Sequence, residues 1–117
     1  MSARDLEKAR RNLQGIPNVE IAPLDLMDSE SIDAFASRSF SSGRSLHLLV
    51  NNAGIMWVPL RRNVRGIEPH LATNYLAQFY LTARPWPALK RAKRARVVNV
   101  SSQGHQFFRL TLKIRIL

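Results

Sequence analysis

The 117-residue chain contains no cysteine. This absence excludes disulfide bonds, cysteine-ligated zinc and a thiol nucleophile, and it is compatible with a reducing compartment. The three histidines, His47, His70 and His105, lack the spacing of a metal site, so no metal is expected. With 45% apolar residues, the composition is that of one small globular domain and not of a disordered chain.

Long hydrophobic runs are also missing. No segment approaches the ~20 apolar residues that a membrane helix needs. Residues 1–8, MSARDLEK, lack the apolar core of a secretory signal, and Asp5 and Glu7 disfavour a mitochondrial presequence. We therefore expect a cytoplasmic protein.

Acidic residues are absent from the second half of the chain. Residues 1–69 hold 9 Lys and Arg and 8 Asp and Glu, a net of +1, whereas residues 70–117 hold 9 Lys and Arg and no acid, a net of +9. Six of these bases lie between Arg84 and Arg96. Such a block can bind a phosphate backbone or an anionic surface, or act as a nuclear address. Because no nucleic-acid-binding motif accompanies it, a solvated helix end is the favoured interpretation.

Hydrophobic periodicity predicts helices and strands in alternation. Helices are expected over 4–14, from Asp28 or Ser29 to 40, and from 68 to a break at Pro85. Strands are expected over 19–24, 46–50 and 96–101, the last two as buried strands. The long helix should bury an apolar stripe of Leu71, Ala72, Tyr75, Leu76 and Phe79. This order of elements predicts an α/β fold with a parallel sheet.

Polar residues follow each predicted strand. Asp25 follows the first, Asn51 and Asn52 the second, and Ser101 and Ser102 the third. Because ligands on parallel sheets bind at the carboxyl ends of the strands, we expect these residues at one edge. Ordinary turn residues are the alternative for any one of them.

Four motifs in order resemble the short-chain dehydrogenase/reductase (SDR) family, in its retinol-dehydrogenase-like and WW-domain-oxidoreductase-like branch. Asn51-Asn52-Ala53-Gly54 resembles the NNAG motif, and residues 96–102 with Gly104 resemble the strand that carries the catalytic serine. Residues 71–79 resemble the long helix, and Asp25-Leu26 resembles the acidic dipeptide that contacts adenine. The resemblance covers residues 3–105.

This resemblance implies a partial Rossmann-like doubly wound parallel sheet, with the central strands and helices only. Residues 1–105 would be an incomplete NAD(P)-binding domain and residues 106–117 a divergent basic tail. The implied activity is hydride transfer between a nicotinamide cofactor and a small-molecule alcohol or carbonyl substrate.

The resemblance also implies two catalytic residues. Ser102 would donate a hydrogen bond to the substrate oxygen and stabilise developing negative charge there. Ser101 is the alternative, although the spacing to Gly104 favours Ser102. Asn74 would help to hold a water in a proton relay, or would face solvent without a role.

The implied cofactor contacts come from three segments. Asp25 and Leu26 would meet the adenine, although a helix-capping turn also explains Asp25. The motif residues that would line the nicotinamide-side ribose are Asn52, Ala53 and Gly54, while Asn51 is better suited to tying strand ends together. Arg4 would pair with the 2′-phosphate of NADP, which slightly favours NADP over NAD.

Two elements of the family pattern are missing. The five glycines are too far apart to form a glycine-rich phosphate loop. Tyr75 and Tyr80 are followed four residues later by Phe79 and Arg84, so neither forms the Tyr-x-x-x-Lys motif, in which the lysine lowers the pKa of the tyrosine.

We therefore expect a fragment, truncated at both ends and inactive by itself. The alternatives are a non-catalytic derivative that binds a full-length relative or forms a homo-oligomer, a pseudogene product, or a basic nucleic-acid-binding module. In the family's strand order 3-2-1-4-5-6, the strand at 19–24 should lose its pairing partner, whereas the two later strands should pair. A marginal monomer with exposed apolar edges is the expected result.

Overall fold

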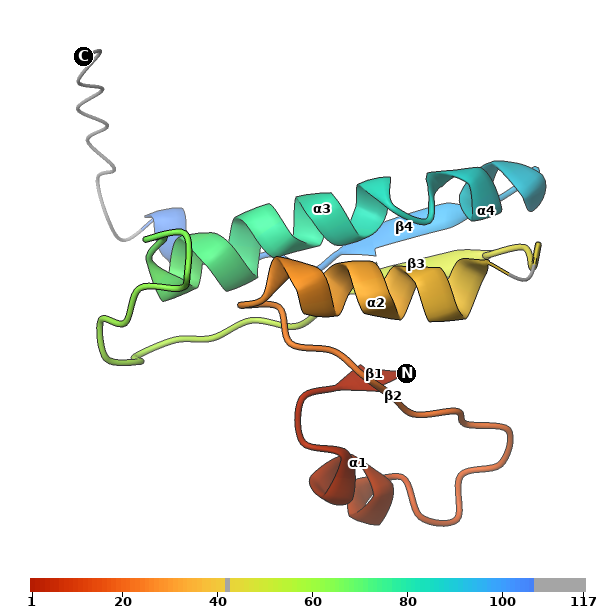
Figure 1. Cartoon of the computed structure of the whole chain (residues 1–117), viewed down its shortest axis with the longest axis horizontal. Helices are drawn as coiled ribbons and strands as arrows, with labels where there is room; N and C mark the ends of the chain where they lie inside the picture. The colour runs from red at the N-terminus through yellow and green to blue at the C-terminus, as the bar shows by residue number, and fades with distance from the viewer. Residues whose placement is uncertain (42, 107–117) are drawn as a thin grey trace.

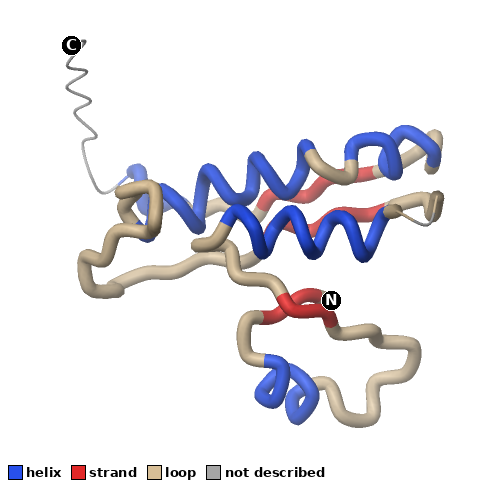
Figure 2. Tube along the Cα trace, viewed as in Figure 1, coloured by secondary structure: helices blue, strands red, loops and turns tan. Residues whose placement is uncertain are grey.

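The computed structural model describes residues 1–41 and 43–106. Apart from Gln106, the predicted basic tail over 106–117 lies outside these residues. The described elements form two parallel β-α-β units, which Figure 1 shows one below the other. In the larger unit, two helices lie side by side across one face of a pair of strands, as the trace in Figure 2 also shows.

The larger unit contains β3 (Leu48–Asn51) and β4 (Arg96–Asn99). The two strands pair in parallel, with Leu48 opposite Arg96 and Asn51 opposite Asn99. This confirms the predicted pairing of the two later strands. The expectation of buried strands is wrong, since Leu48 is 53% exposed and Val50 is 51% exposed. Each strand has one hydrogen-bonded neighbour among the described residues, and the helices cover one face, so the other face remains open.

The smaller unit contains β1 (Ser2–Ala3), α1 (Leu6–Asn12) and β2 (Ala22–Pro23). β2 was expected to lack a partner, which is wrong, because Ala3 lies opposite Pro23 in a short parallel ladder. Pro23 has no N–H to donate, but this position of β2 does not need one. The two hydrogen bonds to β1 come from the residues on either side: Ala22 donates to the Met1 carbonyl at 2.9 Å, and Leu24 donates to the Ala3 carbonyl at 3.0 Å.

Helix α2 (Ser29–Phe40) begins at an Asp28 N-cap, as predicted. The Asp28 carboxylate accepts the Glu30 amide at 2.9 Å, which satisfies one of the free N–H groups of the first turn. α2 then buries Ile32 and Ala36. The core of the molecule is the contact of this helix with the next, and its buried residues are Leu24, Ile32, Ala77 and Leu81.

The long helix is composed of three parts. It runs from η1 (Leu71–Leu76), in π-helical geometry, into α3 (Ala77–Ala83), and after a break at Pro85 into α4 (Trp86–Arg91). The break at Pro85 confirms the prediction.

The predicted apolar stripe of this helix is largely wrong. Ala72 is buried as predicted, but the other four members are exposed: Tyr75 is 66%, Phe79 74%, Leu71 49% and Leu76 37% exposed. Thr73 and Ala77, which the prediction left out, are buried. The buried Thr73, Ala77 and Leu81 are four residues apart and share one helical face, whereas Leu71, Tyr75 and Phe79, also four apart, lie on a neighbouring face that is exposed. Helical spacing therefore allows more than one buried face, and packing of Ala77 and Leu81 against Ile32 of α2 decides which one is used.

Candidate functional site

The carboxyl ends of β3 and β4 border a cavity with a volume of about 630 Å³. Sites for small ligands are roughly 300–1,000 Å³, so this cavity is large enough for one. Its lining comes from three segments, which are residues 51–54 after β3, residues 74–82 on the helix and residues 99–102 after β4. The cavity thus brings together Asn52, Gly54, Asn74 and Ser102, as the expected polar edge requires.

Asp25 and Leu26 are not part of this lining. They follow β2, which belongs to the other two-stranded sheet. Arg4 follows β1 and is exposed in the same smaller unit. The single polar edge expected for all three strands is therefore divided between two sheets, because the strands are not joined into one.

Three polar side chains of the long helix bind the last residue of β3 and the segment that follows it. The Asn74 side chain accepts the Ile55 amide at 2.8 Å and donates to the Ile55 carbonyl at 2.9 Å. Gln78 Nε2 donates to the Ala53 carbonyl at 2.6 Å, and Thr82 Oγ1 accepts from Asn51 Nδ2 at 2.8 Å.

The spacing of these contacts has a simple geometric cause. Four helical residues advance about 6 Å along the helix, and two extended residues advance about 6.6 Å along the strand. Helix positions 74, 78 and 82 therefore stay in step with positions 55, 53 and 51 of the extended segment. Sequence reasoning missed Gln78 and Thr82. Their signal was polar residues four apart on an otherwise apolar helix.

Asn51 joins both strands and the helix. It is buried, and its Nδ2 donates to Thr82 Oγ1 and to Asn99 Oδ1, each at 2.8 Å. The backbone carbonyl of Asn51 accepts the Val100 amide at 3.0 Å. Both donor hydrogens of the side chain are thus used inside the protein, which fits the expected tie between strand ends better than a cofactor contact.

The side chain of Asn74 makes hydrogen bonds that the sequence did not predict, either for a residue that holds a relay water or for a residue without a role. Both polar atoms of its side chain bind the backbone of Ile55, so it is not an idle solvent-facing residue. It also lies within the π-helical segment, a geometry that occurs frequently at functional sites.

Asn52, Ala53 and Gly54 are exposed at the cavity. A Cβ added at Gly54 would lie 3.5 Å from Asn74 Oδ1, which is an ordinary contact. The protein itself therefore leaves room at this position, and a molecule that approaches the Gly54 backbone closely would benefit from the missing side chain.

Ser102 lies at the cavity, where the chain leaves β4. Its Oγ accepts the Gly104 amide at 3.1 Å, at the start of the 3₁₀ turn η2 (Gln103–Gln106). A Cβ at Gly104 would lie 3.4 Å from that oxygen, a tight contact. Gly104 therefore supports the position of the Ser102 hydroxyl.

The Asp25 carboxylate forms a local turn. Its Oδ1 accepts the Met27 amide at 2.9 Å, while the Asp25 amide donates to Ser31 Oγ at 2.9 Å. The cap of α2 is Asp28, so the alternative interpretation of Asp25 as a turn residue describes its observed contacts.

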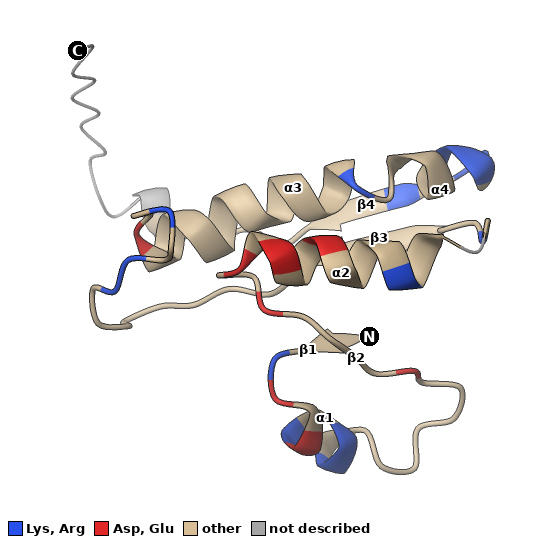
Figure 3. Ribbon diagram, in the orientation of Figure 1, with Lys and Arg blue, Asp and Glu red and all other residues tan. Residues whose placement is uncertain are grey.

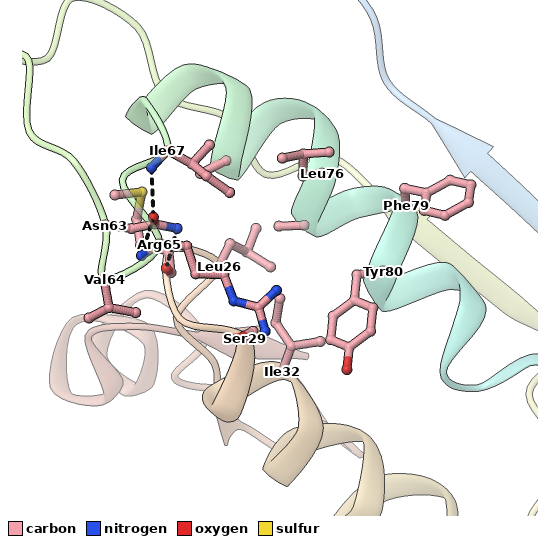
Figure 4. A pocket seen from close by; sticks show the side chains of 13 residues that line it. Leu26, Ser29, Ile32, Asn63, Val64, Arg65, Ile67, Leu76, Phe79 and Tyr80 are labelled. Atoms are coloured by element: carbon pink, nitrogen blue, oxygen red, sulfur yellow. Dashed lines mark hydrogen bonds between the residues drawn. The ribbon is translucent and has the colours of Figure 1, made fainter. Parts of the chain in front are cut away.

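A second cavity, of about 300 Å³, lies between α2, the long helix and the loop at 63–67 (Figure 4). Tyr80 lines it, and its hydroxyl donates to Asp33 Oδ1 at 2.8 Å. This hydrogen bond raises the pKa of Tyr80, with burial contributing in the same direction. Arg84 pairs with the same carboxylate and lies 5.4 Å from the Tyr80 ring centre.

Tyr80 and Arg84 therefore do not substitute for a Tyr-x-x-x-Lys pair. A proton donor that works near neutral pH needs a lowered tyrosine pKa, and here the pKa is raised. The hydroxyl is also directed to Asp33 on α2, and Tyr80 is not part of the lining of the cavity that holds Ser102.

The family is established by comparison with known proteins. Residues 1–109 match the short chain dehydrogenase family, and the chain belongs to it. The chain is 38% identical over 116 residues to retinol dehydrogenase 11 of Mus musculus, covering 94% of this chain and 37% of that protein. It is 44% identical over 98 residues to polyprenol dehydrogenase of Danio rerio, covering 80% and 30%.

Solved structures agree with this assignment. An uncharacterized protein from Mycobacterium paratuberculosis matches with a TM-score of 0.75 and 38% identity, covering 90% of this chain and 37% of that one. A metagenomic short-chain oxidoreductase in complex with NADP matches with a TM-score of 0.67 and 33% identity, covering 86% and 49%. The fold is accordingly a partial Rossmann-like α/β fold. The chain spans about a third of the length of the curated relatives it matches.

Within the described residues, the helices are too short or too polar to cross a membrane.

Proposed function

We propose that this chain supplies the central part of the NAD(P)-binding domain of an oxidoreductase that transfers hydride between a nicotinamide cofactor and an alcohol or carbonyl substrate. The observation that carries the proposal is the cavity at the ends of β3 and β4. It places the Asn52–Gly54 backbone and Ser102 around one space. Membership of the SDR family supports the same chemistry.

The residues present fit a nicotinamide nucleotide. The exposed backbone of Asn52, Ala53 and Gly54 would line the ribose next to the nicotinamide, where the glycine permits close approach. Asp25 and Leu26 would meet the adenine, and Arg4 would meet a 2′-phosphate, which favours NADP. The bound cofactor supplies the hydride chemistry.

The protein contributes positioning around the substrate oxygen. Ser102 would donate its hydroxyl proton in a hydrogen bond to that oxygen, which stabilises negative charge as it develops there. Asn74 would act through the Ile55 backbone, by holding the segment after β3 in place.

This sequence has neither a glycine-rich phosphate loop nor a Tyr-x-x-x-Lys motif. We therefore expect the 117-residue chain alone to bind the cofactor weakly and to show little or no hydride transfer. The same proposal includes a small-molecule substrate, a cytoplasmic location, and association with a full-length relative or with a second copy of the chain.

The test is a titration of the isotopically labelled chain with NADPH, followed by amide chemical shifts. We expect saturable shifts at Asn52, Ala53 and Gly54. Gly54→Val should weaken them strongly, because its side chain would occupy the approach to the backbone. Ala34→Val, at an exposed position of α2, is the control and should leave them unchanged. Shifts that are absent, or scattered away from this segment, would contradict the proposal.

A further inference from the structure

Six basic side chains gather at the end of the molecule where β3 and β4 begin. We call this surface the basic end. Its members are exposed, and they are Arg44, Lys90, Arg91, Lys93, Arg94 and Arg96. Figure 3 shows the blue segments at the end of α4 and the start of β4, beside the loop that precedes β3.

Backbone contacts hold the two contributing segments together. The Leu46 amide donates to the Ala88 carbonyl at 3.0 Å, and the Arg96 amide donates to the His47 carbonyl at 2.9 Å. Arg91 donates to the Arg44 carbonyl at 2.9 Å. Residues 44–47 and 88–96 therefore form one surface, so Arg44 is a neighbour of cations far from it in the sequence.

No acidic side chain neutralises this surface within the described residues. The three ion pairs there are Arg10–Glu7, His70–Glu68 and Arg84–Asp33, and none includes a member of the basic end. The acids of α2 lie in its first half, at Glu30 and Asp33, while Arg38 lies nearer its end. The positive charge of the basic end is therefore available to interact with solvent ions or with an anionic partner.

A helix dipole explains part of the cluster. Lys90 and Arg91 lie in the last turn of α4, where cations are favourable. Lys93, Arg94 and Arg96 lie beyond the helix. Lys93 also has a φ of +59°, which lies in the left-handed region that favours glycine. A lysine therefore occupies a position where glycine would remove backbone strain.

An exposed aromatic residue adjoins the cations. Trp86 opens α4, one helical turn before Lys90, and is 55% exposed. Tryptophan next to lysine and arginine is typical of surfaces that contact lipid headgroups, because the ring is partly apolar and its N–H is polar. α4 has six residues, which is short for a helix that reads a nucleic acid groove.

We propose that the basic end docks on the anionic phospholipid headgroups of a membrane surface. Clusters of four to eight Lys and Arg residues bind such surfaces electrostatically. The cavity with Asn52 and Ser102 lies at the opposite end of β3 and β4, so it would face away from the lipid. This inference is independent of the proposed oxidoreductase function.

The experiment compares two sets of vesicles by co-flotation of the full chain. One set contains phosphatidylcholine alone, and the other contains phosphatidylcholine with phosphatidylserine. We expect binding to the second set that weakens as salt is raised. The triple variant Lys90→Gln/Lys93→Gln/Arg94→Gln should bind roughly a hundredfold more weakly, because each base near an anionic surface contributes roughly a factor of five.

A matched control removes the same charge elsewhere. Lys8→Gln/Arg10→Gln/Arg11→Gln changes three exposed cations of α1 and should reduce binding much less than the first variant. The single variant Arg94→Gln, which removes one exposed side chain, should lose roughly fivefold and guards against unfolding of the triple variant.

Three results would overturn the proposal. The first is equal binding to both sets of vesicles. The second is an equal loss in the α1 control, which would mean that net charge alone is responsible. The third is stronger and equally salt-sensitive binding to a duplex or single-stranded oligonucleotide, which would assign the surface to nucleic acid.

Discussion

Both halves of this molecule are parallel β-α-β units, but they differ in how the crossover meets its strands. In the larger unit, the crossover helix buries Ala72, Thr73, Ala77 and Leu81. Its three polar side chains bind the end of β3 and the segment that follows it. In the smaller unit, α1 buries Ala9 alone, and the strands pair over two positions.

This difference shows what a parallel pair of strands needs. Parallel sheets are normally covered on both faces by helices, and short ladders without such cover contribute little. In the larger unit, helices cover one face of the two strands, and the end of β3 is hydrogen-bonded to the long helix and to β4. We therefore expect the smaller unit to open first when the protein unfolds locally.

The largest expected effect is in the core of the larger unit. Leu81→Ala removes a side chain that is 7% exposed, and we expect it to lower the free energy of unfolding by about 2–5 kcal/mol. Leu6→Ala in α1, a half-buried position of the smaller unit, should cost about 1 kcal/mol or less. Urea denaturation measures both. Similar losses would mean that the two units are equally well packed.

The next effect concerns Asn51. Asn51→Ala removes two hydrogen bonds and leaves Thr82 and Asn99 without this donor, so we expect a loss of about 1–3 kcal/mol. The change compared with it lies where α2 meets the turn after β2 of the smaller unit: Ser31→Ala removes the acceptor of the Asp25 amide and should cost about 1 kcal/mol. The comparison fails if Ser31→Ala proves the more damaging variant in thermal unfolding.

A local effect is expected at Ile55. Asn74→Ala removes the acceptor of the Ile55 amide, so this amide should exchange with solvent deuterium faster, while the Ala22 amide of the smaller unit should be unaffected. Amide exchange followed by NMR measures both. Unchanged protection at Ile55 would show that Asn74 does not hold this segment.

The smallest effect is a pH dependence at the start of the crossover helix. The backbone amide and side chain of His70 and the Leu71 amide lower the pKa of Glu68 to about 2. Since the pKa of Glu68 in the folded protein is below its ordinary value of 4.5, the stabilisation is present above pH 4.5 and is lost as the pH falls toward 2.

A carboxyl-carbon NMR titration should therefore place the Glu68 midpoint well below that of an ordinary glutamate. The Glu68→Gln variant, which cannot titrate, should lose this part of the acid sensitivity of unfolding. A midpoint near 4.5 would show that the hydrogen bonds to His70 and Leu71 do not persist in solution.

Much of the fold could be predicted from local patterns. The Asp28 cap and the break at Pro85 follow from residue chemistry, and the pairing of 48–51 with 96–99 follows from the strand order of the family that the chain resembles. The four motifs in order correctly identified the family, and the first asparagine of the NNAG motif ties the strand ends as expected. The proposed contacts of Arg4, Asp25, Asn52 and Ser102 with a cofactor or substrate remain predictions.

The sequence by itself determined the order of elements, the family and the uneven charge, because capping, proline geometry, strand propensity and charge count depend on residues close along the chain. Only the tertiary structure decided which faces are buried, that β2 pairs with β1, and that Gln78 and Thr82 bind the segment after β3. Burial and pairing depend on what lies opposite. The long helix has apolar residues on more than one face, and its packing against Ile32 of α2 decides that Ala77 and Leu81 are buried while Tyr75 and Phe79 are exposed.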